Sequence, residues 1–221
     1  SAIIEATSAR WKALTGVFIR EGYGLSETSP IVSFNLSSVD RFNGTTGVPL
    51  PSTDVKLLTD DGREAALGEA GEVCVKGPQV MGGYWQQPEA NAAAFTADGY
   101  FRTGDVGVLT PEGLLKLVDR KKDMIIVSGF NVFPNEIEAI AAACPGVLET
   151  ACVGVPDDKT GEAAKLYVVR APASSVSAEQ VMQHCREQLT AYKVPKQVVF
   201  VDALPKSTVG KILRRELRLT A

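Results

Sequence analysis

The sequence offers little that would hold a structural metal ion or a nucleic acid. It has one histidine, His184, and its four cysteines stand far apart with no C-x-x-C pair, so it lacks a ligand set for structural zinc. Its 23 lysines and arginines are outnumbered by 26 aspartates and glutamates, which gives a formal net charge of −3. This balance lacks the basic excess of nucleic-acid-binding proteins, and we expect no nucleic acid partner.

Long apolar runs are absent as well. No segment has the roughly 20 apolar residues of a membrane-spanning helix, and no signal peptide pattern is present. Peripheral association with a membrane stays open. The cysteines have mostly apolar neighbours, which predicts reduced, buried thiols in a cytosolic protein; they are Cys74, Cys144, Cys152 and Cys185. With 45% hydrophobic and 22% charged residues, the chain can form a sizeable core.

The first half of the chain reads mainly as β-structure. A helix over residues 1–15, ended by Gly16, and a short strand over 17–19 are expected first. Alternating apolar residues then predict strands at 31–36, 54–59 and 72–76, a helix over 88–95, and a hairpin of strands 106–109 and 114–118.

The order of expected elements changes after Asp119. We predict a strand at 124–127, a helix at 135–143, strands at 149–155 and 164–170, a second helix, and a last strand at 197–201. This is an α+β pattern. The charged run 119–123 separates two apolar strands, so we place a domain boundary there, between domains 1–119 and 120–221.

The two later helices carry polar signals at their starts. Ser177 and Gln180 form a capping-box pattern that predicts where the second helix begins. Glu136 and Glu138 stand two positions apart and therefore do not share a helix face. We expect Glu136 to complement the positive end of the helix dipole and Glu138 to be solvated.

The segment from Gly22 to Thr28 gathers two glycines, hydroxyls, a carboxylate and an aromatic ring in seven positions. Glycines let backbone amides approach a phosphate, a hydroxyl can donate to it, and a carboxylate can hold Mg²⁺. A glycine-permitted turn with a solvated glutamate would use the same residues. Local chemistry alone leaves both interpretations open.

Further blocks follow in a fixed order. They are YGLSE (23–27), YFRTGD (100–105), DRKKDMI (119–125), SGFNVFPNEIE (128–138) and PKSTVGK (205–211). This series resembles the adenylate-forming acyl-activating enzymes, which include acyl-CoA synthetases, luciferases and the adenylation domains of peptide synthetases. Within that family it looks most like bacterial long-chain fatty-acid–CoA ligases, and the resemblance covers nearly the whole chain.

The resemblance implies an α+β fold in which 1–119 form the β-rich C-terminal portion of the large AMP-binding domain and 120–221 form the small mobile domain. The family enzyme is longer, so the chain is expected to be its C-terminal part and to be inactive alone. GTTGVPL (44–50) superficially resembles the family's phosphate loop. Leu50 stands where that loop has a lysine, and the order along the chain is wrong, so we interpret 44–51 as a structural turn.

The implied reaction joins a fatty acid to ATP, releases pyrophosphate, and transfers the acyl group from AMP to coenzyme A. The implied cofactors are ATP/AMP, Mg²⁺ and coenzyme A, and the expected location is the cytoplasm, with the inner membrane as a peripheral site. An aryl or medium-chain acyl-CoA ligase is an alternative, because the substrate pocket lies upstream. A non-catalytic nucleotide- or CoA-binding module is another. The oligomeric state is left open.

By resemblance, Tyr23 would lie along the adenine, Gly24 would belong to the nucleotide-binding loop, Ser26 would contact the α-phosphate and Glu27 would coordinate Mg²⁺. Asp105 would accept hydrogen bonds from the ribose hydroxyls. The alternatives are turn roles for Glu27 and Asp105.

The remaining implied roles fall near or after the expected boundary. Arg120 would contact the ribose or phosphates, Lys122 would be the hinge, Gly129 would let pantetheine pass the backbone, and Lys211 would be the catalytic cation that bridges carboxylate and nucleotide. Alternatively, Gly129 is a bulge glycine. Lys211 could instead belong to a solvated basic helix face with Arg214, Arg215 and Arg218.

Overall fold

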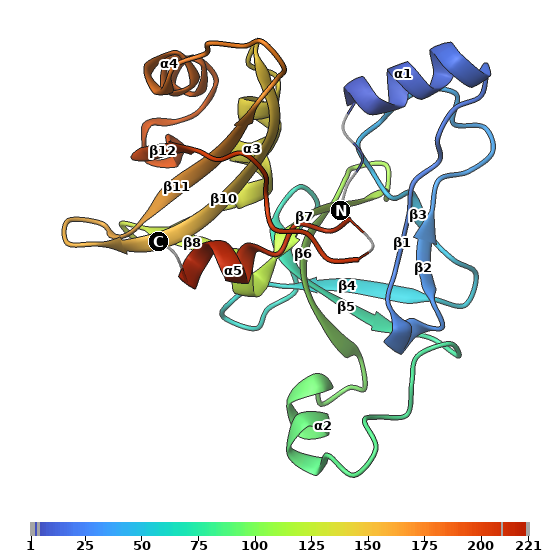
Figure 1. Cartoon of the computed structure of the whole chain (residues 1–221). Helices are drawn as coiled ribbons and strands as arrows, with labels where there is room; N and C mark the ends of the chain where they lie inside the picture. The colour runs from blue at the N-terminus through green and yellow to red at the C-terminus, as the bar shows by residue number, and fades with distance from the viewer. Residues whose placement is uncertain (1–2, 4, 209, 220–221) are drawn as a thin grey trace. The chain divides into compact units, whose positions relative to one another are not determined.

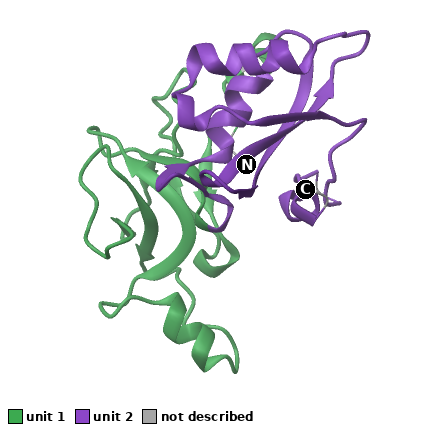
Figure 2. Ribbon diagram, turned by 90° about the vertical axis from the view of Figure 1, so that its left-hand side faces the viewer, with its two compact units in different colours: residues 1–121 green, residues 122–221 purple. Residues whose placement is uncertain are grey.

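The computed structural model describes residues 3, 5–208 and 210–219. The first residues of the expected N-terminal helix (1–2 and 4) and Val209 of the PKSTVGK block lie outside the described residues. The chain divides into two compact units, Ser1–Lys121 and Lys122–Ala221 (Figure 2). Both units combine helices with β-sheet, so the predicted α+β class is confirmed.

The first unit contains two antiparallel sheets (Figure 1). A three-stranded sheet has the order β1 (Gly22–Gly24), β2 (Ile31–Phe34), β3 (Val48–Pro49), and a four-stranded sheet has the order β4 (Asp54–Leu58), β5 (Ala70–Lys76), β6 (Phe101–Leu109), β7 (Leu115–Arg120). The helical elements are α1 (Glu5–Thr15), the 3₁₀ turn η1 (Ser26–Thr28) and α2 (Pro88–Ala94).

One core serves both sheets of this unit. Tyr23 and Val32 from the smaller sheet pack in the same buried cluster as Leu57, Val73 and Leu115 from the larger one. Polar bonds join the sheets as well. The backbone N–H of Thr46 donates to the carbonyl of Leu115 at 2.7 Å, and the N–H of Leu115 donates to Gly47 at 2.8 Å.

The segment 44–51 is therefore structural, as predicted. The Thr46 hydroxyl lies 2.9 Å from that of Ser33 and donates to the Leu115 carbonyl at 3.0 Å. Thr45 and Thr46 are both buried, so their hydroxyls serve the interior of the protein.

The second unit is built on a single sheet of five strands (Figure 1). Its order is β10 (Val147–Asp157), β11 (Gly161–Arg170), β8 (Ile125–Val127), β9 (Phe130–Val132), and β12 (Gln197–Phe200) pairs in parallel with β11. The helical elements are η2 (Lys121–Asp123), α3 (Pro134–Ala142), α4 (Ala178–Gln188), η3 (Ala191–Lys193) and α5 (Arg214–Leu219).

Alternation along β10 and β11 gives this sheet two covered faces. Cys152 faces a core that includes Ile137 of α3 and Val181 of α4. Its neighbour Val153 faces a second cluster, which contains Leu217 of α5. The C-terminal helix is therefore part of the packed structure of this unit.

Most expected elements are present within a few residues of their predicted bounds. The capping box is confirmed, because the Ser177 hydroxyl accepts from the Gln180 N–H at 3.3 Å and the Gln180 side chain accepts from the Ser177 N–H at 2.9 Å. All four cysteines are free and buried, as predicted. None of the helices in the described part of the chain is long and apolar enough to cross a membrane.

One expected strand is absent. Residues 17–19 form no strand, and the strand that pairs with Ile31–Phe34 is instead Gly22–Gly24. Apolar character alone does not make a strand without a partner for its backbone. The charged run 119–123 contains the end of β7 and the 3₁₀ turn η2, and the side chains of Asp119 and Asp123 are buried.

Candidate functional site

The motif YGLSE begins with a strand and ends in a tight turn. Tyr23 in β1 is buried, and the following turn is fixed by Thr28, whose hydroxyl donates to the Pro30 carbonyl at 2.6 Å. Gly24 has a structural reason to be glycine, since a Cβ there would lie 1.8 Å from the Pro30 carbonyl oxygen. The turn leaves Ser26 exposed and Glu27 partly buried.

Three of the predicted nucleotide-binding residues meet in the first unit. The Tyr23 hydroxyl donates to Oδ2 of Asp105 at 2.6 Å, although the two residues are 82 positions apart. Arg120, the direct partner of Asp105 in the β6–β7 register, has its Nε 3.7 Å from Oδ1 of Asp105. An aromatic ring, a carboxylate and a guanidinium from three strands thus form one polar cluster.

The electrostatics of this cluster keep Tyr23 protonated. Burial raises the pKa of the Tyr23 phenol above its usual value of 10.0, and the charge and hydrogen bond of Asp105 raise it further. Asp105 is held in place by its own backbone N–H, which donates to the Thr103 hydroxyl at 3.1 Å. With Oδ2 taken by Tyr23, the carboxylate retains free lone pairs for hydroxyl donors from a ligand.

Glu27 lies at the other end of the motif and is oriented by Tyr84. The Tyr84 hydroxyl donates to Oε1 of Glu27 at 3.1 Å, and the Met81 N–H donates to the Glu27 carbonyl at 2.8 Å. No group of three metal-ligating side chains occurs among the residues described. A single oriented carboxylate fits a Mg²⁺ ion that takes its other ligands from phosphates and water, and does not fit an all-protein cage.

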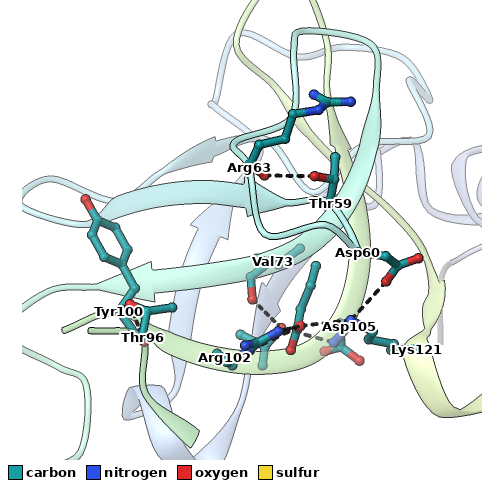
Figure 3. A network of polar contacts seen from close by, with 11 residues as sticks. Thr59, Asp60, Arg63, Val73, Thr96, Tyr100, Arg102, Asp105 and Lys121 are labelled. Atoms are coloured by element: carbon teal, nitrogen blue, oxygen red, sulfur yellow. Dashed lines mark hydrogen bonds and ion pairs between the residues drawn. The ribbon is translucent and has the colours of Figure 1, made fainter. Parts of the chain in front are cut away.

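A second polar network lies beside Asp105 (Figure 3). Glu72 in β5 is buried and accepts a bond from Arg102 at 2.6 Å, while Lys121 lies 3.4 Å from Glu72 and 3.1 Å from Asp60. Burial by itself raises the pKa of Glu72, but the hydrogen bond and charge of Arg102 outweigh burial and lower it. Sequence reasoning missed Glu72; its signal is one acid within the apolar strand AGEVCVK.

The candidate residues of the second unit are displayed on its surface. Ser128 and Gly129 have φ values of 51° and 84° and form the two-residue turn between β8 and β9, which favours glycine. The predicted bulge is instead this tight hairpin turn. Lys122 and Lys211 are exposed. The structure therefore does not bring Gly129 and Lys211 into a packed cluster of their own unit.

The expected solvation of Glu138 is wrong, and the alternative of a solvated basic face does not hold at Arg214. Glu138 accepts the Cys152 N–H at 2.7 Å and pairs with Arg214 at 2.7 Å, and both side chains are largely buried. Glu138 faces β10 because α3 packs on that strand. Glu136 does lie in the first turn of α3, as predicted, where it also pairs with Lys193 at 2.8 Å.

Comparison with known proteins identifies the family of this chain. The model for the AMP-binding enzyme matches residues 1–85, and the model for the AMP-binding enzyme C-terminal domain matches residues 136–211. The chain belongs to the AMP-binding enzymes. The family resemblance predicted from the sequence is thereby confirmed. The YGLSE motif lies in the first matched segment, and Lys211 is the last residue of the second.

The relatives of this chain include a long-chain-fatty-acid–CoA ligase and a feruloyl-CoA synthase. A long-chain-fatty-acid–CoA ligase of Escherichia coli O6:H1 is 54% identical over 214 residues, which cover 97% of this chain and 38% of the relative. A feruloyl-CoA synthase of Amycolatopsis sp is 42% identical over 204 residues, 92% of this chain and 41% of the relative. ATP-bound MatB from Rhodopseudomonas palustris is 38% identical with a TM-score of 0.94, over 100% of this chain and 44% of MatB.

The chain thus spans well under half the length of each of these relatives. It is similar to that part of them throughout.

Proposed function

We propose that these residues serve the ATP-dependent, AMP-forming activation of a long-chain fatty acid and its transfer to coenzyme A. The observation that carries the proposal is the cluster of Tyr23, Asp105 and Arg120, placed in a chain 54% identical to a long-chain-fatty-acid–CoA ligase. We assign residues 1–119 to the large AMP-binding domain and 120–221 to the small mobile domain.

In this proposal the first unit holds the nucleotide. The ring of Tyr23 provides a flat apolar wall for the adenine, and the Asp105 carboxylate accepts bonds from two ribose hydroxyls. The Arg120 guanidinium, 57% exposed, is free to reach a ribose oxygen or a phosphate. The Ser26 hydroxyl donates to the α-phosphate, and Gly24 sets the backbone path of that loop.

Glu27 would hold Mg²⁺ together with the phosphates of ATP. The metal would supply positive charge that neutralises the triphosphate as a carboxylate approaches it. Tyr84 donates to Oε1 of Glu27, which would leave Oε2 available to hold the metal.

The second unit supplies the groups that differ between the two steps. Lys211 provides a cation that bridges the fatty-acid carboxylate and the α-phosphate during adenylation. The carboxylate oxygen then attacks phosphorus and pyrophosphate leaves. Lys122 absorbs the backbone change between the steps, and Gly129 lets the pantetheine of coenzyme A pass close to the backbone, where the thiolate sulfur displaces AMP from the acyl carbon.

Nucleotide binding is tested on this chain by calorimetric titration with ATP and MgCl₂. We expect Asp105→Ala to weaken binding on the order of tenfold or more, because it removes charge-assisted bonds. Glu112→Gln, in the exposed turn between β6 and β7, is the matched control and should bind as the unchanged chain does. Equal affinity of both variants would contradict the role of Asp105.

Catalysis is tested in a chimeric enzyme, in which the residues of this chain replace the matching segment of the Escherichia coli relative. We expect palmitate-dependent ATP–pyrophosphate exchange, and Lys211→Ala should abolish it while thioester formation from supplied palmitoyl-AMP continues. Loss of both steps would contradict the division of roles. If the chimeric enzyme without further substitutions binds nucleotide but shows no ATP–pyrophosphate exchange, a non-catalytic binding module is favoured.

An aryl acid is a second candidate substrate, favoured by the 42% identity to a feruloyl-CoA synthase. Comparing palmitate, octanoate and ferulate in the longest natural polypeptide that contains these residues decides between the classes.

We also propose a cytoplasmic location with peripheral binding to the inner membrane surface, because a long-chain acyl substrate partitions into lipid. Flotation with anionic phospholipid vesicles, with and without palmitate, tests that location.

A further inference from the structure

The loop that carries Lys211 is closed on itself by backbone bonds. The Leu213 N–H donates to the Pro205 carbonyl at 2.8 Å, and the Ser207 N–H donates to the Lys211 carbonyl at 2.8 Å. The Lys211 N–H donates to the Ser207 hydroxyl at 3.2 Å. We call residues 205–208 and 210–213 the lysine loop. The position of the Lys211 backbone therefore depends on the contacts at the two ends of this loop.

Arg214 holds one end. It directly follows the lysine loop, and its guanidinium forms a fork on Glu138, with Nε 3.0 Å from Oε1 and Nη2 2.7 Å from Oε2. Nη2 also donates to Oδ1 of Asn135. Only 17% of the Arg214 side chain is exposed, so this fork is desolvated and fixes the orientation of the first turn of α5.

The same arginine reaches the first residues of the second unit. Its Nη1 lies 3.6 Å from Oδ2 of the buried Asp123. On the next turn of α5, Arg218 lies 3.2 Å from Oδ1 of Asp123 and donates to the Lys122 carbonyl at 3.3 Å. The start of α5 is thus bonded to the segment that follows the division between the units.

The other end of the lysine loop follows the buried Leu204 and has an exposed ion pair. Lys206 pairs with Glu149 at 2.6 Å, but both side chains are more than a third exposed. Exposed pairs of this kind contribute little because water and salt screen them. Arg214 therefore forms the stronger of these two ion pairs.

We propose that Arg214 is a positioning residue that makes the lysine loop and the Lys122–Asp123 segment one rigid body. The role of Lys211 in adenylation rests on the proposed function, whereas the mechanical link does not. When the chain bends at Lys122, the ammonium of Lys211 then follows Asp123 through Arg214 rather than moving independently on its loop.

Hydrogen exchange of the whole 221-residue chain tests the link. In Arg214→Gln we expect peptides covering 122–127 and 205–213 to exchange faster together, on the order of tenfold, with peptides from β11 unchanged. Arg214→Lys keeps the charge but loses the fork, so both peptides should shift in the same direction by less. Arg215→Gln removes the same charge from an exposed position of α5 and should change neither.

A change in only one of the two peptides, or in neither, would overturn the link. If Arg214→Gln also speeds exchange in β11, the variant has unfolded and Arg214→Lys decides by the same criterion.

The positioning role of Arg214 is tested in the chimeric enzyme described above. Arg214→Lys should lower kcat of adenylate formation on the order of tenfold, with the KM for ATP and the thioester step unchanged, because the cation is misplaced only in the first step. Equal loss in both steps, or unchanged adenylation, would overturn positioning. If the chimeric enzyme without further substitutions forms no acyl-adenylate, that result counts against the proposed function. The hydrogen-exchange measurement then tests the link by itself.

Discussion

The two units hold their candidate residues in different ways. In the first unit Tyr23, Asp105 and Arg120 come from three strands and contact one another. In the second unit Gly129 and Lys211 are exposed on turns, and the lysine loop depends on ion pairs at its ends. The candidate residues of the first unit are therefore arranged by contacts with one another, whereas Gly129 and Lys211 of the second unit lie singly at its surface.

Each unit also has a largely buried glutamate that pairs with an arginine. Glu72 binds Arg102 and Lys121, and Glu138 binds Arg214, which in turn contacts Asp123. A buried acid that loses its partner is costly. The four predictions that follow test whether packing stabilises the first unit and whether ion pairs stabilise the second.

The largest effect is expected at Gly24. In Gly24→Ala the new Cβ would meet the Pro30 carbonyl oxygen at 1.8 Å, so the backbone of the β1 turn must move, at a cost of about 4 kcal/mol in the free energy of unfolding. Gly129→Ala meets open space and only has to adopt a positive φ, for about 1 kcal/mol. Urea unfolding followed by circular dichroism measures both.

A comparable loss in the two glycine variants would break the comparison. It would mean that the turn at Ser128–Gly129 is as tightly packed as the turn after Tyr23.

The second effect is expected at Glu138. Glu138→Gln removes the carboxylate that forms the fork with Arg214 in a largely buried site and leaves the longer contact to Asp123, which should cost about 3 kcal/mol. Glu136→Gln removes the same charge from the same helix, but its pair with Lys193 is partly exposed, and the loss should stay below about 1 kcal/mol. Urea midpoints of the two variants give the difference, and similar values would show that ion pairing does not determine the second unit.

Local signals in the sequence predicted local structure well. The capping box at Ser177 and Gln180 involves neighbours three positions apart, so spacing alone specifies it. The strand Gly22–Gly24 was missed because glycines at both of its ends hide the apolar alternation, and only its pairing with Ile31–Phe34 makes it a strand.

The site depends on distant pairs that spacing cannot supply. Tyr23 meets Asp105 across 82 positions, and Glu138 meets Arg214 across 76. Family resemblance named Tyr23 and Asp105 without their contact. Glu138 was taken as solvated because its partner is too far along the chain for helix periodicity to indicate it.

The third effect is a change in alkaline stability. The pKa of Tyr23 is raised in the folded state above its usual 10.0, first by burial and then by Asp105, so folding is favoured below pH 10 and this stabilisation is lost as the pH rises above 10. Tyr23→Phe loses one hydrogen bond, about 1 kcal/mol at pH 7, and lacks that alkaline slope.

Urea midpoints at pH 8 and pH 11 should therefore converge for the two proteins as the pH rises. Tyr100, whose pKa is raised to about 12 mainly by its bond to Asp54, titrates in both proteins and cancels. Parallel pH slopes would show that the Tyr23 hydroxyl is not buried against Asp105.

The smallest effect leaves stability unchanged and counts thiols. Burial raises the pKa of Cys74 and of Cys185 to about 11, and all four cysteines are buried, so a thiol reagent at pH 8 should label none of them quickly in the folded protein. Cys74 belongs to the first unit and the other three to the second. Mass spectrometry after brief labelling in intermediate urea then reports one label or three, according to which unit opens first, and labelling without urea would contradict the burial.

The distance in sequence between Glu138 and Arg214 has a consequence during synthesis. The ribosome adds roughly 5–20 residues per second, so the 76 positions between the two residues correspond to several seconds of translation. Throughout that interval the nascent α3 carries a carboxylate whose cation does not yet exist. Helix α5 therefore completes the charge balance of a helix made long before it, and a ribosome stalled ahead of residue 214 would hold an unfinished domain.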